Sequence, residues 1–154
     1  MTKAVVAGAL AVAALNVPPA ILGGWLWYWG EPTERGARAF WLLLRIGQGA
    51  VLMLAIAVGS LAAAGKHSSE GLFYLYALLP IAVSFVAEQL RIASAQIVLD
   101  QHGLENAQAV GSLDEHAQRH LVAQIVRREV AVMALAAAVV VFLALRAAST
   151  AHGF

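Results

Sequence analysis

The sequence predicts an all-α integral membrane protein, a single domain over residues 1–154 with four transmembrane helices in an antiparallel bundle. Of its residues, 61 % are hydrophobic and 12 % are charged, and soluble domains carry about twice that share of charge. Four stretches reach the roughly 20 apolar residues that span hydrocarbon as a helix. They are rich in Ala and Leu without the alternation of barrel strands, and only helices and closed barrels satisfy the backbone in lipid.

The first two helices are predicted over residues 4–29 and 39–65. The first stretch resembles the start of a secretory signal peptide, but its apolar run continues far enough to span a bilayer, which leaves a signal anchor as the alternative. Pro18 and Pro19 remove backbone donors within it, so we expect a kink there. The second stretch is interrupted by Arg45.

The third and fourth helices are predicted over residues 71–99 and 121–147. Glu88 and Arg91 lie inside the third stretch. The polar connections at residues 31–36 and 65–71 are short, with Pro or Gly as breakers. Such short connections join antiparallel neighbours.

Residues 100–120 form a polar connection that predicts a helical hairpin. Ser112 and Glu115 have the spacing of a capping box, so we expect the fourth helix to begin near Leu113, with Gly103 or Gly111 in the turn. That helix would be about 52 Å long, whereas hydrocarbon is about 30 Å thick. The third and fourth helices should therefore extend beyond the bilayer as a hairpin.

Aromatic residues gather at the predicted helix ends, as expected of side chains that favour membrane interfaces. We interpret them as two interfacial belts rather than as core residues. The belt residues are Trp25, Trp27, Tyr28, Trp29, Phe40 and Trp41 on one side, and Phe73, Tyr74 and Tyr76 on the other.

Lys and Arg near the membrane ends predict the orientation. Five lie on the hairpin side and three on the side of the termini, which places the hairpin side in the cytoplasm. We expect the membrane to be the plasma membrane. The residues are Arg35, Arg38, Arg119, Arg127 and Arg128 against Lys3, Lys66 and Arg146.

Composition also excludes several classes of function. The net charge of +1 gives no support to nucleic-acid binding, which needs a basic excess. With no cysteine, thiol catalysis, disulfide exchange and thiolate metal sites are excluded. No catalytic motif is present, and no cofactor is indicated, so a non-enzymatic role is favoured over an enzyme.

Charged and polar residues inside the predicted spans form one candidate cluster. Buried charges in a membrane are costly and normally turn inward and pair. We expect Glu88 to pair with Arg45, with Arg91 or Arg128 in reach. The predicted intramembrane network consists of Arg45, Gln48, Ser84, Glu88, Arg91, Arg128 and Glu129.

Three roles are open for this network. Ion pairs near an interface often fix helix register, and long arginines can reach the headgroups. Alternatively, four arginines against two glutamates form a basic pocket for an anionic ligand or lipid headgroup. That pocket would comprise Arg45, Arg91, Arg127 and Arg128. Proton relay through Glu88 is the third possibility.

His116 and His120 have the i, i+4 spacing that can hold a metal. No further ligand is fixed by spacing, so we predict a solvated helical face and no metal.

The leading functional hypothesis is a small accessory or scaffold subunit of a larger or homo-oligomeric membrane assembly. Membrane lipids and a protein partner, or a second copy, would bind through the hairpin or the membrane faces. An oligomeric transporter or channel that uses the Arg–Glu network is the first alternative. An anionic-lipid-binding or lipid-modifying membrane protein is the second.

Overall fold

The computed structural model describes residues 2–29, 33–104 and 107–151. Within these ranges the chain is helical and contains no strand. Four helices are each long and apolar enough to cross a membrane. The elements are α1 (Thr2–Trp29), α2 (Glu34–Ala63), α3 (Gly71–Gln101), the 3-10 helix η1 (Ala107–Ser112) and α4 (Glu115–Thr150).

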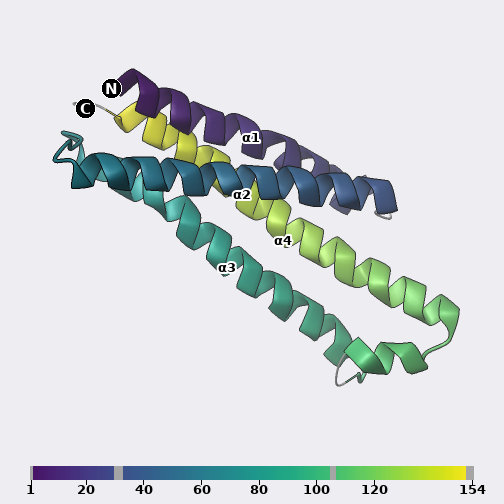
Figure 1. Ribbon diagram of the computed structural model, residues 1–154. Helices are drawn as coiled ribbons and strands as arrows, with labels where there is room; N and C mark the ends of the chain where they lie inside the picture. Colours follow the sequence, from purple (N-terminus) through teal and green to yellow (C-terminus); the bar gives the residue numbers. More distant parts are fainter. Residues whose placement is uncertain (1, 30–32, 105–106, 152–154) are drawn as a thin grey trace.

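Helix α4 is the centre of the arrangement, because it packs against both α1 and α3. Figure 1 shows both ends of the chain at one end of the molecule, beside the α2–α3 connection. From that connection α2 and α3 diverge, and α3 and α4 continue to the η1 end of the molecule. Helix α2 contacts α1 extensively but α3 and α4 only sparingly.

Helix α2 begins at Glu34, five residues before the apolar stretch that predicted it. Thr33 caps this end, since its side-chain oxygen accepts a hydrogen bond from the Gly36 amide at 3.1 Å. An exposed i, i+4 pair between Glu34 and Arg38 follows at 2.8 Å. A hydroxyl cap and such a pair stabilise a helical turn outside the apolar segment. The other predicted loop residues, 31 and 32, lie outside the described residues.

Glycines terminate α2 and α3 by the same geometry. Gly65 and Gly103 have φ angles of +75° and +67°, a left-handed conformation that costs glycine little. After Gly103, the Leu104 amide donates to the Leu99 carbonyl at 3.0 Å. After Gly65, the Lys66 amide donates to the Leu61 carbonyl at 3.0 Å. These are Schellman terminations, and Gly103 is one of the two glycines predicted in the hairpin turn.

The start of α4 differs from the predicted capping box. Ser112 belongs to η1, and the helix begins at Glu115 rather than near Leu113. Asp114 is the cap, because its carboxylate accepts from the Ala117 amide at 3.2 Å. A carboxylate also suits the positive end of the helix dipole. Ser112 and Glu115 have the spacing of a capping box, but Ser112 is the last residue of the 3-10 helix and is therefore not the N-cap of α4.

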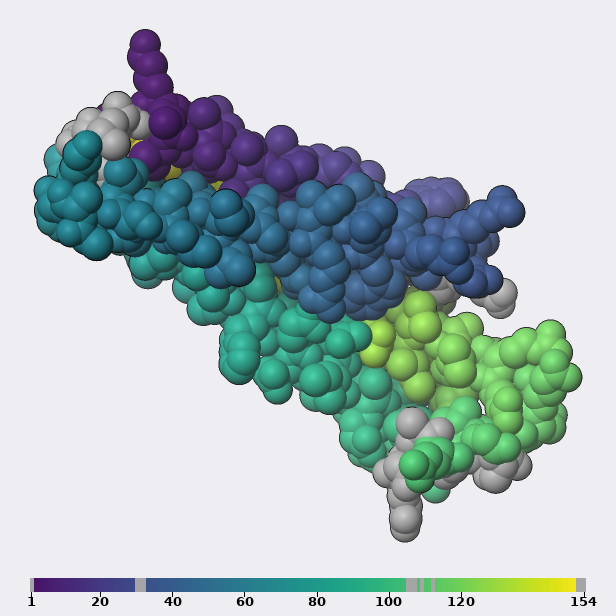
Figure 2. Space-filling model, in the orientation of Figure 1, coloured from purple at the N-terminus to yellow at the C-terminus, as the bar shows by residue number. Residues whose placement is uncertain are grey.

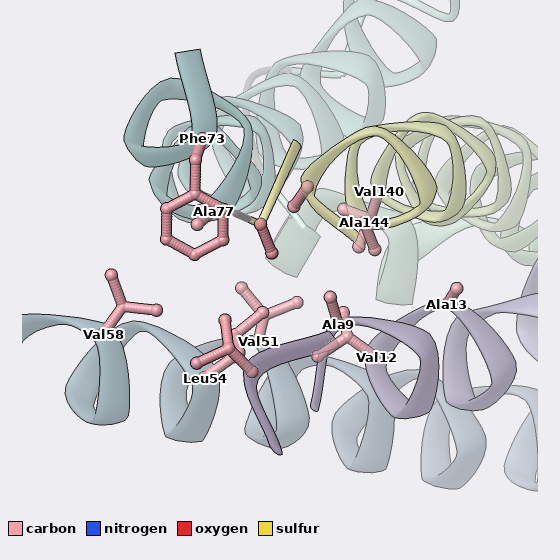
Figure 3. Packing of buried hydrophobic residues seen from close by; sticks show 13 residues of the cluster. Ala9, Val12, Ala13, Val51, Leu54, Val58, Phe73, Ala77, Val140 and Ala144 are labelled. Carbon is pink, nitrogen blue, oxygen red and sulfur yellow. The ribbon is translucent and has the colours of Figure 1, made fainter. Parts of the chain in front are cut away.

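Alanine-rich packing forms the core at the end of the molecule that holds the termini. Figure 3 shows Phe73 and Ala77 of α3 facing the small side chains of α1 and α4, with Val51, Leu54 and Val58 of α2 beside them. Phe73 is fully buried. Small residues let helices approach closely, which is how helices associate in an apolar solvent.

A second core lies toward the hairpin and corrects part of the aromatic interpretation. Phe40 is fully buried against Leu26, Leu44 and Met133. Phe40 and Phe73 are thus core residues and not belt residues, because both side chains are enclosed by neighbouring helices. By contrast, the aromatic residues at the end of α1 are exposed, as the belt interpretation expects: Trp25, Trp27, Tyr28 and Trp29.

The α3–α4 hairpin has a small core of its own. Val98 and Leu99 of α3 pack against Leu121 of α4. Gln118 also holds the connection, since its side-chain amide donates to the carbonyls of Gly111 and Leu113 at 3.2 and 3.1 Å. These contacts keep the ends of α3 and α4 together although the two helices are joined by a long connection.

Candidate functional site

The principal polar site is a group of five side chains that we call the Arg–Glu cluster. Helices α2 and α3 each supply two neighbours on one face, because residues three apart lie on the same side of a helix, and α4 supplies one residue. Figure 2 shows the face of the molecule on which α2 and α3 separate. The cluster comprises Arg45 and Gln48 of α2, Glu88 and Arg91 of α3, and Glu129 of α4.

Glu88 is the acceptor at the centre of the cluster. Its Oε1 accepts from Arg45 Nη1 at 2.7 Å and from Gln48 Nε2 at 3.4 Å. Its Oε2 accepts from Arg91 Nε at 3.0 Å. Both carboxylate oxygens are therefore occupied by donors from α2 and α3. Charge-assisted hydrogen bonds of this kind are about twice as strong as neutral ones.

Arg91 connects the cluster to α4 and to an aromatic ring. Its Nη1 lies 3.7 Å from Glu129 Oε2, and its guanidinium lies over the Trp41 ring at 5.2 Å from the centroid. A guanidinium over an indole face gains cation–π attraction. Arg91 thereby ties α3 to both α2 and α4.

The charges of the Arg–Glu cluster balance, and its carboxylates are largely buried. Two arginines face two glutamates, so the cluster is internally neutral. The side chains of Glu88 and Glu129 are 24 % and 19 % exposed, whereas Arg45 is 55 % exposed. The carboxylates are thus held inside and paired, which leaves no unpaired charge for an anionic ligand.

The structure leaves three of the predicted residues outside the cluster. In the described ranges Ser84 and Arg128 form no hydrogen bond or ion pair with it. Arg127 turns to α1, where its Nε donates to the Trp27 carbonyl at 2.9 Å. The four arginines of the predicted basic pocket are therefore divided between two places. Arg45 and Arg91 bind carboxylates, while Arg127 and Arg128 do not.

A buried side-chain amide, just before the two prolines of α1, joins α1 to α2. Asn16 is 2 % exposed, and its Nδ2 donates to the carbonyls of Val12 at 2.9 Å and Gly47 at 3.3 Å. The sequence indicated Asn16 only as a polar residue within an apolar span. It could not indicate the partner, because Gly47 is one glycine among several in α2.

We expect Gly47→Ala to destabilise the protein relative to Gly49→Ala. An alanine Cβ at position 47 would lie 2.6 Å from Asn16 Oδ1, whereas a Cβ at position 49 meets no atom within 4 Å. Both changes gain about 1 kcal/mol of helix propensity. Displacing the buried amide loses a hydrogen bond of about 1 kcal/mol and adds steric strain.

The measurement is thermal unfolding in mild detergent, followed by circular dichroism. Gly49→Ala should raise the midpoint slightly and Gly47→Ala should lower it. Equal midpoints for the two variants would contradict the close packing of Asn16 on Gly47.

The described histidines do not form a metal-binding group. His116 and His120 are exposed on α4, and His102 Nδ1 lies 2.9 Å from the Val98 carbonyl of its own helix. Among the described residues, no group of three or more His, Cys, Asp or Glu side chains is placed to hold a metal ion.

The fold and the cluster together define a class: a helical protein with four helices able to cross a membrane, three of which are joined by paired charges. Comparison of the chain with protein-family models, with curated proteins and with solved structures finds no match.

Proposed function

We propose that this protein is a non-enzymatic integral membrane protein, an accessory or scaffold subunit of a larger or homo-oligomeric assembly. Its four helices would span the plasma membrane as an antiparallel bundle. The α3–α4 hairpin would lie on the cytoplasmic side, where five of the eight Lys and Arg residues near the membrane ends are found.

The observation that carries this proposal is the internal neutrality of the Arg–Glu cluster. A transport path needs charged groups that face a water-filled cavity and remain able to bind the cargo. Here Glu88 has both oxygens occupied, and Arg91 is shared between two carboxylates. These charges connect α2, α3 and α4, which favours a structural role.

The outer faces of the helices add support. A groove of about 440 Å³ between α3 and α4 is lined almost entirely by apolar side chains, including Leu79, Val86 and Leu135. Phe85 and Leu135 are 65 % and 68 % exposed. In a membrane such faces are covered by lipid or by further helices, and a small bundle with much uncovered surface suits an assembly.

Site-directed crosslinking through the hairpin tests the proposal. Because the sequence has no cysteine, Gln108→Cys introduces the only thiol, at an exposed position of η1. Ser149→Cys is the matched control, because it is exposed near the opposite end of α4. Gln118 is unsuitable for this purpose, since it holds the connection itself.

With a thiol-reactive crosslinker in native membranes, Gln108→Cys should give a discrete adduct larger than one copy, and Ser149→Cys should not. Native mass spectrometry in mild detergent should show the same assembly. A single copy in both measurements would overturn the proposal. Ion or solute flux in proteoliposomes that is abolished by Glu88→Gln or Arg45→Gln, in folded protein, would favour the transporter alternative instead.

A further inference from the structure

Two arginines of α4 remain without a carboxylate partner. In the described ranges, neither Arg127 nor Arg128 forms an ion pair, whereas Arg38 and Arg119 near this end each pair with a glutamate at 2.8 Å. Both guanidinium groups are exposed. Two adjacent positive charges without a counter-charge attract an anion.

Arg127 is also held in place. Its Nε donates to the Trp27 carbonyl at 2.9 Å, one of the last carbonyls of α1, which have no partner within the helix. This bond uses only Nε, so both Nη atoms of Arg127 remain available, and the side chain of Trp27 is half exposed. Tryptophan favours the level of the lipid headgroups.

An apolar groove starts at this position and runs between α1 and α4. It has a volume of about 440 Å³, and its lining is almost entirely apolar. Trp27 and Ala20 line it from α1, and Ala131, Leu135 and Ala138 line it from α4. The stretch from residue 131 to residue 138 covers about 10 Å, which accommodates part of an acyl chain.

The arginines and the groove are in register on α4. Arg127, Ala131 and Ala138 are at i, i+4 and i+11, while Arg128 and Leu135 are at i and i+7. Positions with these spacings follow one side of a helix. Arg127 and Arg128 therefore precede the groove-lining residues of α4 at the hairpin end of the groove.

We propose that the α1–α4 groove, together with Arg127 and Arg128, binds an anionic phospholipid. The lipid phosphate lies at the two guanidinium groups, and one acyl chain lies along the groove. Guanidinium groups bind phosphate oxygens through paired hydrogen bonds, and basic sites on the cytoplasmic side of membrane proteins recognise anionic headgroups. This inference rests on the proposed membrane insertion but not on the proposed role as a subunit.

Native mass spectrometry of the full chain tests the site, with dioleoyl phosphatidylglycerol and dioleoyl phosphatidylcholine as probes that share their acyl chains. Wild-type protein should bind phosphatidylglycerol more tightly. Arg127→Gln with Arg128→Gln should weaken that binding by about 25-fold, since each charge contributes about five-fold. Arg119→Gln is the control, because it removes one charge from the same helix outside the groove.

Two further variants and one competition experiment are measured alongside the double variant. Among the described residues Arg128 forms no hydrogen bond or ion pair, so Arg128→Gln should keep the wild-type unfolding midpoint while it weakens phosphatidylglycerol binding. Ala138→Leu fills the groove at an exposed position and should weaken both lipids equally. Inorganic phosphate at millimolar concentration should not compete, because it lacks the acyl chain.

The inference is overturned if wild-type protein has no preference for phosphatidylglycerol. It is also overturned if the double variant binds like wild type, or if Arg119→Gln weakens binding as much as Arg128→Gln. Recovery of the chain in the membrane fraction, and the crosslinking of Gln108→Cys, are measured separately. Failure at the lipid site is therefore distinguishable from failure of membrane insertion or of the subunit role.

Discussion

Gly23→Ala should be among the most destabilising single-methyl substitutions in this protein, with an expected net loss of about 1 kcal/mol. An alanine Cβ at position 23 would lie 2.5 Å from Phe40 Cε2 and 2.6 Å from Ala134 Cβ. Phe40 is fully buried, and Ala134 can move only with its backbone. Overpacking of this kind costs about 1–3 kcal/mol and exceeds the gain of about 1 kcal/mol in helix propensity.

Gly24→Ala is the matched control for this substitution. It adds the same methyl group to the next residue of α1, where a Cβ would meet no atom within 4 Å. Thermal unfolding in mild detergent should give a midpoint below wild type for Gly23→Ala and at or above wild type for Gly24→Ala. Identical midpoints would show that α1, α2 and α4 do not meet at Gly23.

Removing the negative charge of Glu88 should have the second large effect, about 2 kcal/mol. Glu88→Gln preserves size but leaves Arg45 and Arg91 facing a neutral amide that bears its own donors. Arg45 then has no carboxylate partner, and the partly buried Arg91 keeps only the 3.7 Å contact with Glu129, while its own desolvation remains. Glu88→Asp keeps the charge and should recover part of the loss.

Arg38→Gln is the control for the Glu88 prediction, because it also breaks an arginine–glutamate pair. The side chains of Arg38 and Glu34 are 78 % and 87 % exposed, and exposed pairs contribute little. Its unfolding midpoint should stay close to wild type. Equal losses for Glu88→Gln and Arg38→Gln would show that the cluster contributes no more than a solvated surface pair.

The sequence was sufficient to predict which residues of α2 and α3 pair in the Arg–Glu cluster. Spacings of three residues placed Arg45 with Gln48 and Glu88 with Arg91, and the cost of charge in an apolar segment favoured pairing. The structure brings these residues together at 2.6–3.4 Å. The sequence could not assign Arg127 to α1, because its partner is a backbone carbonyl 100 residues away.

Composition and hydrophobic length alone determined that this chain is helical and has four segments able to cross a membrane, because an apolar run of this length has few other stable forms. The choice of packing faces was decided only in the tertiary structure. Almost every side of these helices is apolar, so periodicity does not distinguish a face that packs from a face that meets lipid. Burial of Phe40 against Gly23, and of Asn16 against Gly47, depends instead on the fit of individual side chains.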